Sequence, residues 1–115
     1  VEQDPTIANN VLMLTPFSAD NPAENVQSFV KKYQEAYGAT PDQFAADAYD
    51  AIYVIKAAVE KAGSTSGAAL ASALTSLTVE GVTGIMTWTA NGNTNKPASA
   101  ILYYDGVGTL FDSQD

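Results

Sequence analysis

The sequence predicts an α/β fold, because a short apolar strand, three amphipathic helices and a β-rich final third follow one another within 115 residues. The strand is the apolar run Val11–Leu14, which ends at Thr15-Pro16. A run without polar alternation is typical of a strand buried on both faces inside a parallel sheet. We therefore expect this strand to have neighbours on both sides.

The first predicted helix covers residues 22–37. Asn21 is expected to cap it, Pro22 takes its first position, and Glu24 completes a capping box. Gly38 follows as a stop signal. The apolar residues that recur at helical spacing are Val26, Phe29, Val30, Tyr33 and Tyr37.

The second and longest predicted helix covers residues 41–62 and ends before Gly63. Thr40 is its expected cap, Pro41 its first residue, and Gln43 is expected to reach back to the cap. Its core face is predicted to consist of Phe44, Ala48, Ile52, Ile55 and Val59, and Ala45, Tyr49 and Ala58 widen it.

A third, shorter helix is predicted around residues 70–77, and the pattern changes from Thr78 onward. Turns are expected at residues 81–84 and 90–93, with a strand at 85–89 between them. Two further strands, 98–104 and 107–111, flank the hairpin signal Asp105-Gly106. The tail, residues 113–115, is expected to fray.

Composition excludes several classes of function. Five Lys and Arg against thirteen Asp and Glu give a net charge of −8, which argues against binding nucleic acid or an anionic membrane. Without Cys or His the chain cannot build a Cys/His zinc site, a cysteine nucleophile or a Ser/His/Asp triad. We expect no catalytic residues, no metal site and no cofactor. A signal peptide, if the protein has one, has been removed or lies outside these residues.

The predicted elements do not complete a sheet. Three amphipathic helices need a sheet to cover, yet only one buried-looking strand precedes Ile85. Leaving four of its backbone groups buried and unpaired costs about 4 to 12 kcal/mol, against the 5 to 15 kcal/mol that typically holds a domain together. We infer that the missing strands come from another chain, a swapped copy, or an earlier part of the same polypeptide.

Several segments resemble one family in the expected order. They are LMLTPFSADNP at 12–22, FVKKYQEAYGATPDQFAADAYDAIYVIKAAVEKAGS at 29–64, and EGVTGIMTWTANGNTNKP at 80–97, followed by a strand and the DG hairpin. Over roughly residues 10–112 the chain resembles the C-terminal part of the type I periplasmic binding proteins. These are the extracytoplasmic solute-binding proteins of ABC transporters for branched-chain and other amino acids.

The resemblance implies a three-layer α/β fold with two lobes that close on a small ligand. Residues 1–97 would form the last part of the N-terminal lobe, with the second crossover near residues 15–17. Residues 98–115 would form the third crossover, near Lys96 to Ala100, and the return to the C-terminal lobe. The implied ligand is a branched-chain or other aliphatic amino acid, the implied partner is an ABC permease, and the implied location is periplasmic or at the cell surface.

Three residues are expected at the ligand. On the resemblance, Phe44 faces the cleft and packs on the ligand side chain, although it also fits the core stripe of its helix. Asp47 would receive the ligand's ammonium, or would be a solvated acid near the positive end of the helix dipole. Phe17 would line the cleft edge after the strand, or would cover the first helix.

The sequence also allows other functions. A regulator or receptor with the same fold would sense a ligand rather than deliver it. Paired carboxylates at Asp47 and Asp50 would suggest an enzyme, but the sequence supplies no opposed nucleophile, and Asp50 is otherwise structural or solvent-facing. Trp88 is expected to pack, and Thr89 stands where the family often has an acid, which puts the local turn hydrogen bond in doubt.

Overall fold

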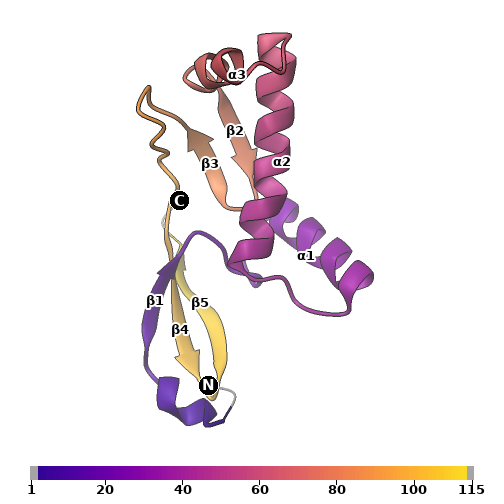
Figure 1. The fold of residues 1–115 in the computed structure, drawn as a ribbon. Coiled ribbons are helices and arrows are strands. Elements are labelled where there is room, and N and C mark those ends of the chain that lie inside the picture. Colours follow the sequence, from indigo (N-terminus) through magenta and orange to yellow (C-terminus); the bar gives the residue numbers. More distant parts are fainter. Residues whose placement is uncertain (1–2, 114–115) are drawn as a thin grey trace. The chain divides into compact units, whose positions relative to one another are not determined.

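The computed structural model describes residues 3–113, which divide into two compact units (Figure 1). Unit 1 combines the described residues up to Gln43 with those from Pro97 onward, and unit 2 is Phe44–Lys96. The chain therefore enters unit 2 at the start of its longest helix and leaves it immediately after Lys96. No helix among the described residues is both long enough and apolar enough to cross a membrane.

Unit 1 contains a three-stranded antiparallel sheet in the order β1-β4-β5. A short 3-10 helix, Pro5–Ala8, precedes β1, Leu12–Thr15, and the other strands are β4, Ser99–Tyr104, and β5, Val107–Ser113. Asp105 and Gly106 join β4 to β5 with φ angles of 47° and 78°, so the predicted hairpin is confirmed. Ser113 ends β5, and the remainder of the tail that we expected to fray lies outside the described residues.

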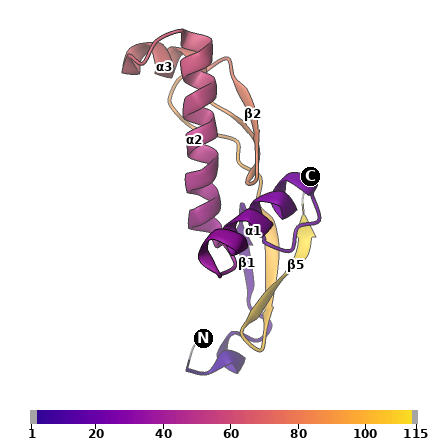
Figure 2. The ribbon, with the colours of Figure 1, turned by 90° about the vertical axis from the view of Figure 1, so that its right-hand side faces the viewer.

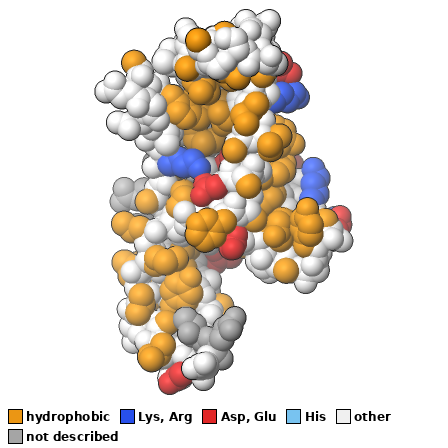
Figure 3. All heavy atoms as spheres, viewed as in Figure 1, with side chains coloured by type: hydrophobic (Ala, Val, Ile, Leu, Met, Phe, Trp, Pro, Cys, Tyr) orange, Lys and Arg blue, Asp and Glu red, His pale blue; other side chains and the backbone are white. Residues whose placement is uncertain are grey.

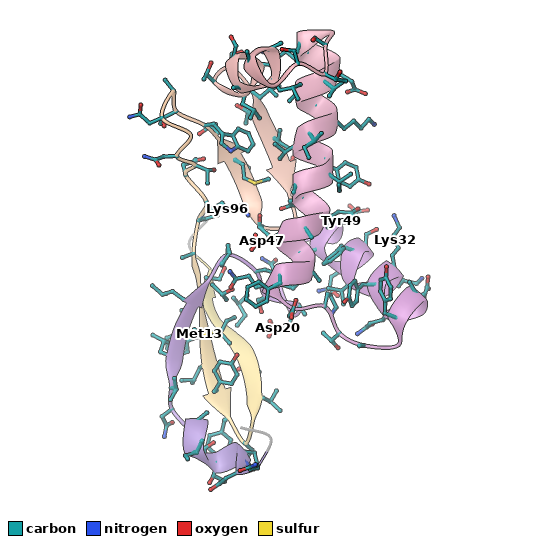
Figure 4. The ribbon with its side chains drawn as sticks, viewed as in Figure 1. Met13, Asp20, Lys32, Asp47, Tyr49 and Lys96 are labelled. Carbon is teal, nitrogen blue, oxygen red and sulfur yellow. The ribbon has the colours of Figure 1, made fainter. Side chains whose placement is uncertain are left out.

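The prediction for the first strand is wrong in two respects. β1 pairs antiparallel with β4, Leu12 opposite Leu102, and it lies at the edge of the sheet. Three of its four residues are exposed, and Leu14 is 70% exposed. Hydrophobic side chains accordingly gather on the face of this sheet in Figure 3, and Met13 projects from β1 in Figure 4. An apolar run indicates that both faces of the strand pack against other elements. It determines neither the direction of the strand relative to its neighbour nor which elements pack on it.

The helix of unit 1, α1, spans Glu24–Tyr37 and begins two residues later than predicted. The Asn21 side chain accepts the amide hydrogen of Ala23 at 3.0 Å, and so closes a turn before the helix instead of capping it. Gly38 ends the helix with φ 68°, as expected. The first three residues of the predicted stripe, Val26, Phe29 and Val30, are buried.

Unit 2 consists of two helices and a hairpin. Helix α2, Gln43–Ala62, is followed by α3, Gly67–Leu74, and then by β2, Thr78–Gly81, and β3, Gly84–Thr87. The hairpin lies alongside α2 in Figures 1 and 2. Strand β2 was not predicted, because alternation around the single apolar residue Val79 is too short a signal.

The predicted core face of α2 is wrong for this chain. Phe44, Ala48, Ile52 and Ile55 are exposed, and of the wider predicted stripe Ala58 is buried. The other residues that α2 buries are Ala46 and Asp50, which the prediction did not include. The helix is apolar on more than one side, so its periodicity does not indicate which side the chain itself covers. Asp50 bonds to the hairpin, and the exposed large side chains form an apolar stripe, which we call the outer stripe of α2: Phe44, Ile52 and Ile55.

Candidate functional site

The segment that follows β1 is fixed by its own side chains. The Thr15 hydroxyl donates to the Gln43 side-chain oxygen at 2.8 Å, so Gln43 holds this segment rather than reaching back to the helix cap. Phe17 is buried, and its ring meets that of Phe29 edge to face at a centroid distance of 5.8 Å. In this chain Phe17 therefore covers the first helix, which is the alternative that its position suggested.

Asp20 links the same segment to β5. Its carboxylate accepts the amide hydrogen of Leu110 at 2.8 Å and the hydroxyl hydrogen of Ser18. Burial alone would raise the pKa of Asp20, but the hydrogen bonds from Ser18 and from the Leu110 amide outweigh it and hold the pKa below its ordinary value. Asp20 (Figure 4) is therefore an ionised structural anchor at neutral pH.

An open hollow of about 810 Å³ lies beside Asp20 in unit 1. Much of its polar lining is already engaged, since the Gln27 amide donates to the Asn21 carbonyl at 2.7 Å and the Gln34 amide to the Thr40 hydroxyl at 3.3 Å. It offers one anion and no cation. The hollow therefore lacks the opposite charge that would hold the carboxylate of an amino acid.

Phe44 lies in the first turn of α2 with 77% of its surface exposed. Its helical spacing also allowed a place in the core, but in this chain Phe44 does not belong to the core. A large aromatic ring in the first turn of a helix, uncovered by its own chain, is available for contact with another group.

Asp47 lies one turn further along α2 and forms an ion pair with Lys96. The Lys96 ammonium is 2.5 Å from one Asp47 oxygen, and the two side chains are 26% and 35% exposed, respectively. Figure 4 shows the two side chains meeting. Asp47 is therefore not the solvated acid that its position also suggested. Any ammonium of a ligand would have to compete with Lys96.

Asp50 is the most completely engaged acid of unit 2. It is 2% exposed and accepts three hydrogen bonds from the turn between β2 and β3: from the Val82 amide at 2.9 Å, the Thr83 amide at 2.9 Å and the Thr83 hydroxyl at 2.6 Å. A carboxylate bound in this way does not serve as half of a catalytic pair with Asp47. In the sequence, this role of Asp50 is indicated only by the presence of an acid on an apolar, alanine-rich helix. Nothing in the sequence indicates that its partner is Thr83, 33 residues away.

The turn after Trp88 is closed by the backbone. The Thr89 amide donates to the Asn93 carbonyl at 2.9 Å, and Gly92 has φ 82°. Backbone hydrogen bonds therefore close this turn, although Thr89 stands where the family often has an acid. Among the described residues no group of three or more acidic side chains is placed to hold a metal ion.

Comparisons with known proteins now add to this geometry. A family model described as periplasmic binding protein matches residues 3–108. A leucine-binding protein from Thermotoga maritima is 28% identical with a TM-score of 0.76, and the alignment covers 91% of this chain and 31% of that one. A substrate-binding protein of an ABC transporter from Desulfitobacterium hafniense, solved in complex with Leu, is 27% identical with a TM-score of 0.79, covering 90% and 32%. No curated protein sequence matches the chain significantly.

A third structure shows the same fold at lower identity. The benzoate complex of a solute-binding protein from R. palustris is 20% identical with a TM-score of 0.79, covering 92% of this chain and 30% of that one. These likenesses confirm the expected fold class. The chain spans 30 to 32% of the length of these three proteins.

Proposed function

Because this chain belongs to the periplasmic binding protein family, we propose that it is part of the solute-binding component of an ABC transporter and that its ligand is an amino acid. The observation that carries this proposal is the similarity, at 27% identity over 90% of the chain, to a substrate-binding protein solved in complex with Leu. A branched-chain or other aliphatic side chain is the proposed specificity. The family consists of solute-binding proteins rather than enzymes, and it is extracytoplasmic; a periplasmic or cell-surface location is proposed here.

The proposed mechanism is closure of two lobes around the ligand. Ligand contacts on both lobes lower the free energy of the closed state relative to the open state, and an ABC permease recognises the closed state. No covalent bond is made or broken. We propose the second crossover near residues 15–17 and the third near residues 96–100. Because β1 pairs with β4 in one sheet, we assign the residues before the second crossover to the same lobe as residues 98–115, and not to the N-terminal lobe with the rest of 1–97.

The exposed apolar surfaces support a second part of the proposal. In unit 1, β1 is an edge strand with exposed Leu12 and Leu14, and in unit 2 the outer stripe of α2 is exposed. Because the chain spans about a third of the length of the relatives it matches, we propose that the remainder of the parent chain covers β1 and, on the outer stripe, Ile52 and Ile55, and leaves Phe44 to the ligand. A swapped second copy is the competing occupant, and the mass of the purified protein in solution distinguishes the two.

Titration of the intact protein with leucine tests the proposed function. We expect saturable binding by calorimetry, with valine and isoleucine competing and glutamate and lysine not competing. We expect no measurable binding to the 115-residue chain alone, since a ligand held from two sides there lacks the contacts that the remainder of the parent chain supplies. Absence of binding by every aliphatic amino acid tested would contradict the amino-acid assignment.

Phe44→Ala in the intact protein should weaken leucine binding more than tenfold, about 1.4 kcal/mol, because it removes an exposed ring that we propose packs on the ligand side chain. Circular dichroism should show the fold unchanged. Ile55→Ala on the same outer stripe is the matched control: we place Ile55 against the parent chain and not against the ligand, so this substitution should leave affinity within about twofold. An unchanged affinity in Phe44→Ala would place Phe44 among the residues that only pack.

A further inference from the structure

The last three residues of unit 2, 94–96, which we call the returning segment, each make a contact with another part of that unit. Thr94 forms a β-bridge with Trp88, and the Asn95 side-chain oxygen accepts both the Thr87 amide at 2.7 Å and the Thr87 hydroxyl at 2.9 Å. These two contacts hold the segment against β3 and its continuation. Lys96 makes the third contact, to Asp47, on a different element.

The Asp47–Lys96 pair is the contact that links this segment to α2. It joins residues 49 positions apart at 2.5 Å. The ion pair between Lys56 and Glu60, also in unit 2, serves as a comparison. The Lys56 ammonium nitrogen is 3.9 Å from a Glu60 carboxylate oxygen, and the two side chains are 65% and 67% exposed. Exposed pairs of that kind contribute little to stability, whereas a shorter and half-buried pair is screened less by solvent and is strengthened as a charge-assisted hydrogen bond.

The position of this pair gives it a consequence beyond local stability. Asp47 lies just inside the start of unit 2, and Lys96 is its last residue. Only Pro97 and Ala98 separate Lys96 from the first residue of β4. Proline fixes its own φ, so few backbone rotations remain free between the fastened segment and the sheet.

We propose that the Asp47–Lys96 ion pair is a latch that holds the returning segment on α2 and confines the flexibility of this connection to Pro97 and Ala98. Lys96 then acts as a positioning residue: it fixes where the chain leaves unit 2. Asp47 is assigned to Lys96 rather than to the ligand's ammonium.

Hydrogen exchange in the ligand-free intact protein tests the latch. In Lys96→Gln the amides of Thr87 and Thr89, which bond to Asn95 and Asn93, should exchange about tenfold faster than in the wild type, the equivalent of about 1.4 kcal/mol of local opening. Lys96→Arg should keep most of the protection because it keeps the charge. Lys56→Gln is the matched control and should leave both amides unchanged. Equal exchange in Lys96→Gln and the wild type would overturn the proposal.

Leucine binding separates the latch from a direct ligand contact at Asp47. If the pair acts as a latch, Asp47→Asn and Lys96→Gln remove the same interaction and should change affinity in the same direction. If Asp47 receives the ligand's ammonium, Asp47→Asn should weaken binding while Lys96→Gln strengthens it by removing a competitor, and that result would overturn the assignment. The binding experiment rests on the proposed function, because it requires that leucine binds. The exchange experiment uses no ligand and tests whether the ion pair holds the returning segment even if the proposed function is wrong.

Discussion

Asp50→Ala should lower the free energy of unfolding of the intact protein by about 3 to 5 kcal/mol, which is a large effect for one substitution. The substitution leaves three donors of the β2–β3 turn, two amides and a hydroxyl, without their acceptor in a buried position. Each buried donor left unpaired costs about 1 to 3 kcal/mol, and release of the buried charge offsets part of the sum. Urea denaturation followed by circular dichroism measures the change.

Two further measurements make the Asp50 prediction specific. The amides of Val82 and Thr83 should be protected from hydrogen exchange in the wild type and should lose that protection in Asp50→Ala. Glu60→Ala removes an exposed acid from the same helix and should change stability by less than about 0.5 kcal/mol. Equal stabilities of Asp50→Ala and Glu60→Ala would show that the turn does not depend on this carboxylate.

The sequence predicts the helices of this chain better than it predicts their ends. Apolar spacing and the stop signals Gly38 and Gly63 are local properties, and both glycines have positive φ as expected. The starts of α1 and α2 depend on hydrogen bonds that alternative partners can take. The Asn21 side chain accepts the amide hydrogen of Ala23, which precedes the first residue of α1, and the Gln43 side chain pairs with Thr15, 28 residues away. Such choices are set by tertiary structure rather than by neighbouring residues.

Long-range pairing accounts for the larger errors. The direction of β1 depends on β4, almost ninety positions later, and the buried face of α2 depends on a hairpin whose first strand the sequence barely indicates. For the site, Phe44 was placed by resemblance and is exposed, while Phe17 is buried against Phe29. Lys96 was not singled out as a partner of Asp47, because nothing local connects two residues 49 positions apart. The apolar surplus that suggested absent strands is visible as the exposed β1 and the outer stripe of α2.

Gly81→Ala should destabilise the protein by about 2 to 4 kcal/mol, because a methyl group at this position has no room. A Cβ built on Gly81 would overlap one Asp50 oxygen, and it would lie 2.5 Å from the carboxyl carbon and 2.6 Å from the other oxygen. A flexible side chain would move aside, but Asp50 is held by three hydrogen bonds and is buried. Relief of the clash therefore breaks some of those bonds.

A double-mutant cycle distinguishes this clash from a general sensitivity of the hairpin. In an Asp50→Ala background the obstructing carboxylate is absent, so adding Gly81→Ala should cost less than about 0.5 kcal/mol, and the cycle should show a coupling energy above about 1.5 kcal/mol. Gly67→Ala is the matched control: a Cβ there meets nothing within 4 Å, and alanine in the first turn of α3 should be neutral or slightly stabilising. If the losses of stability in Asp50→Ala and Gly81→Ala are additive, the Asp50 carboxylate does not govern the close approach of β2 to α2. In that case a clash with Asp50 is not the reason why position 81 requires glycine.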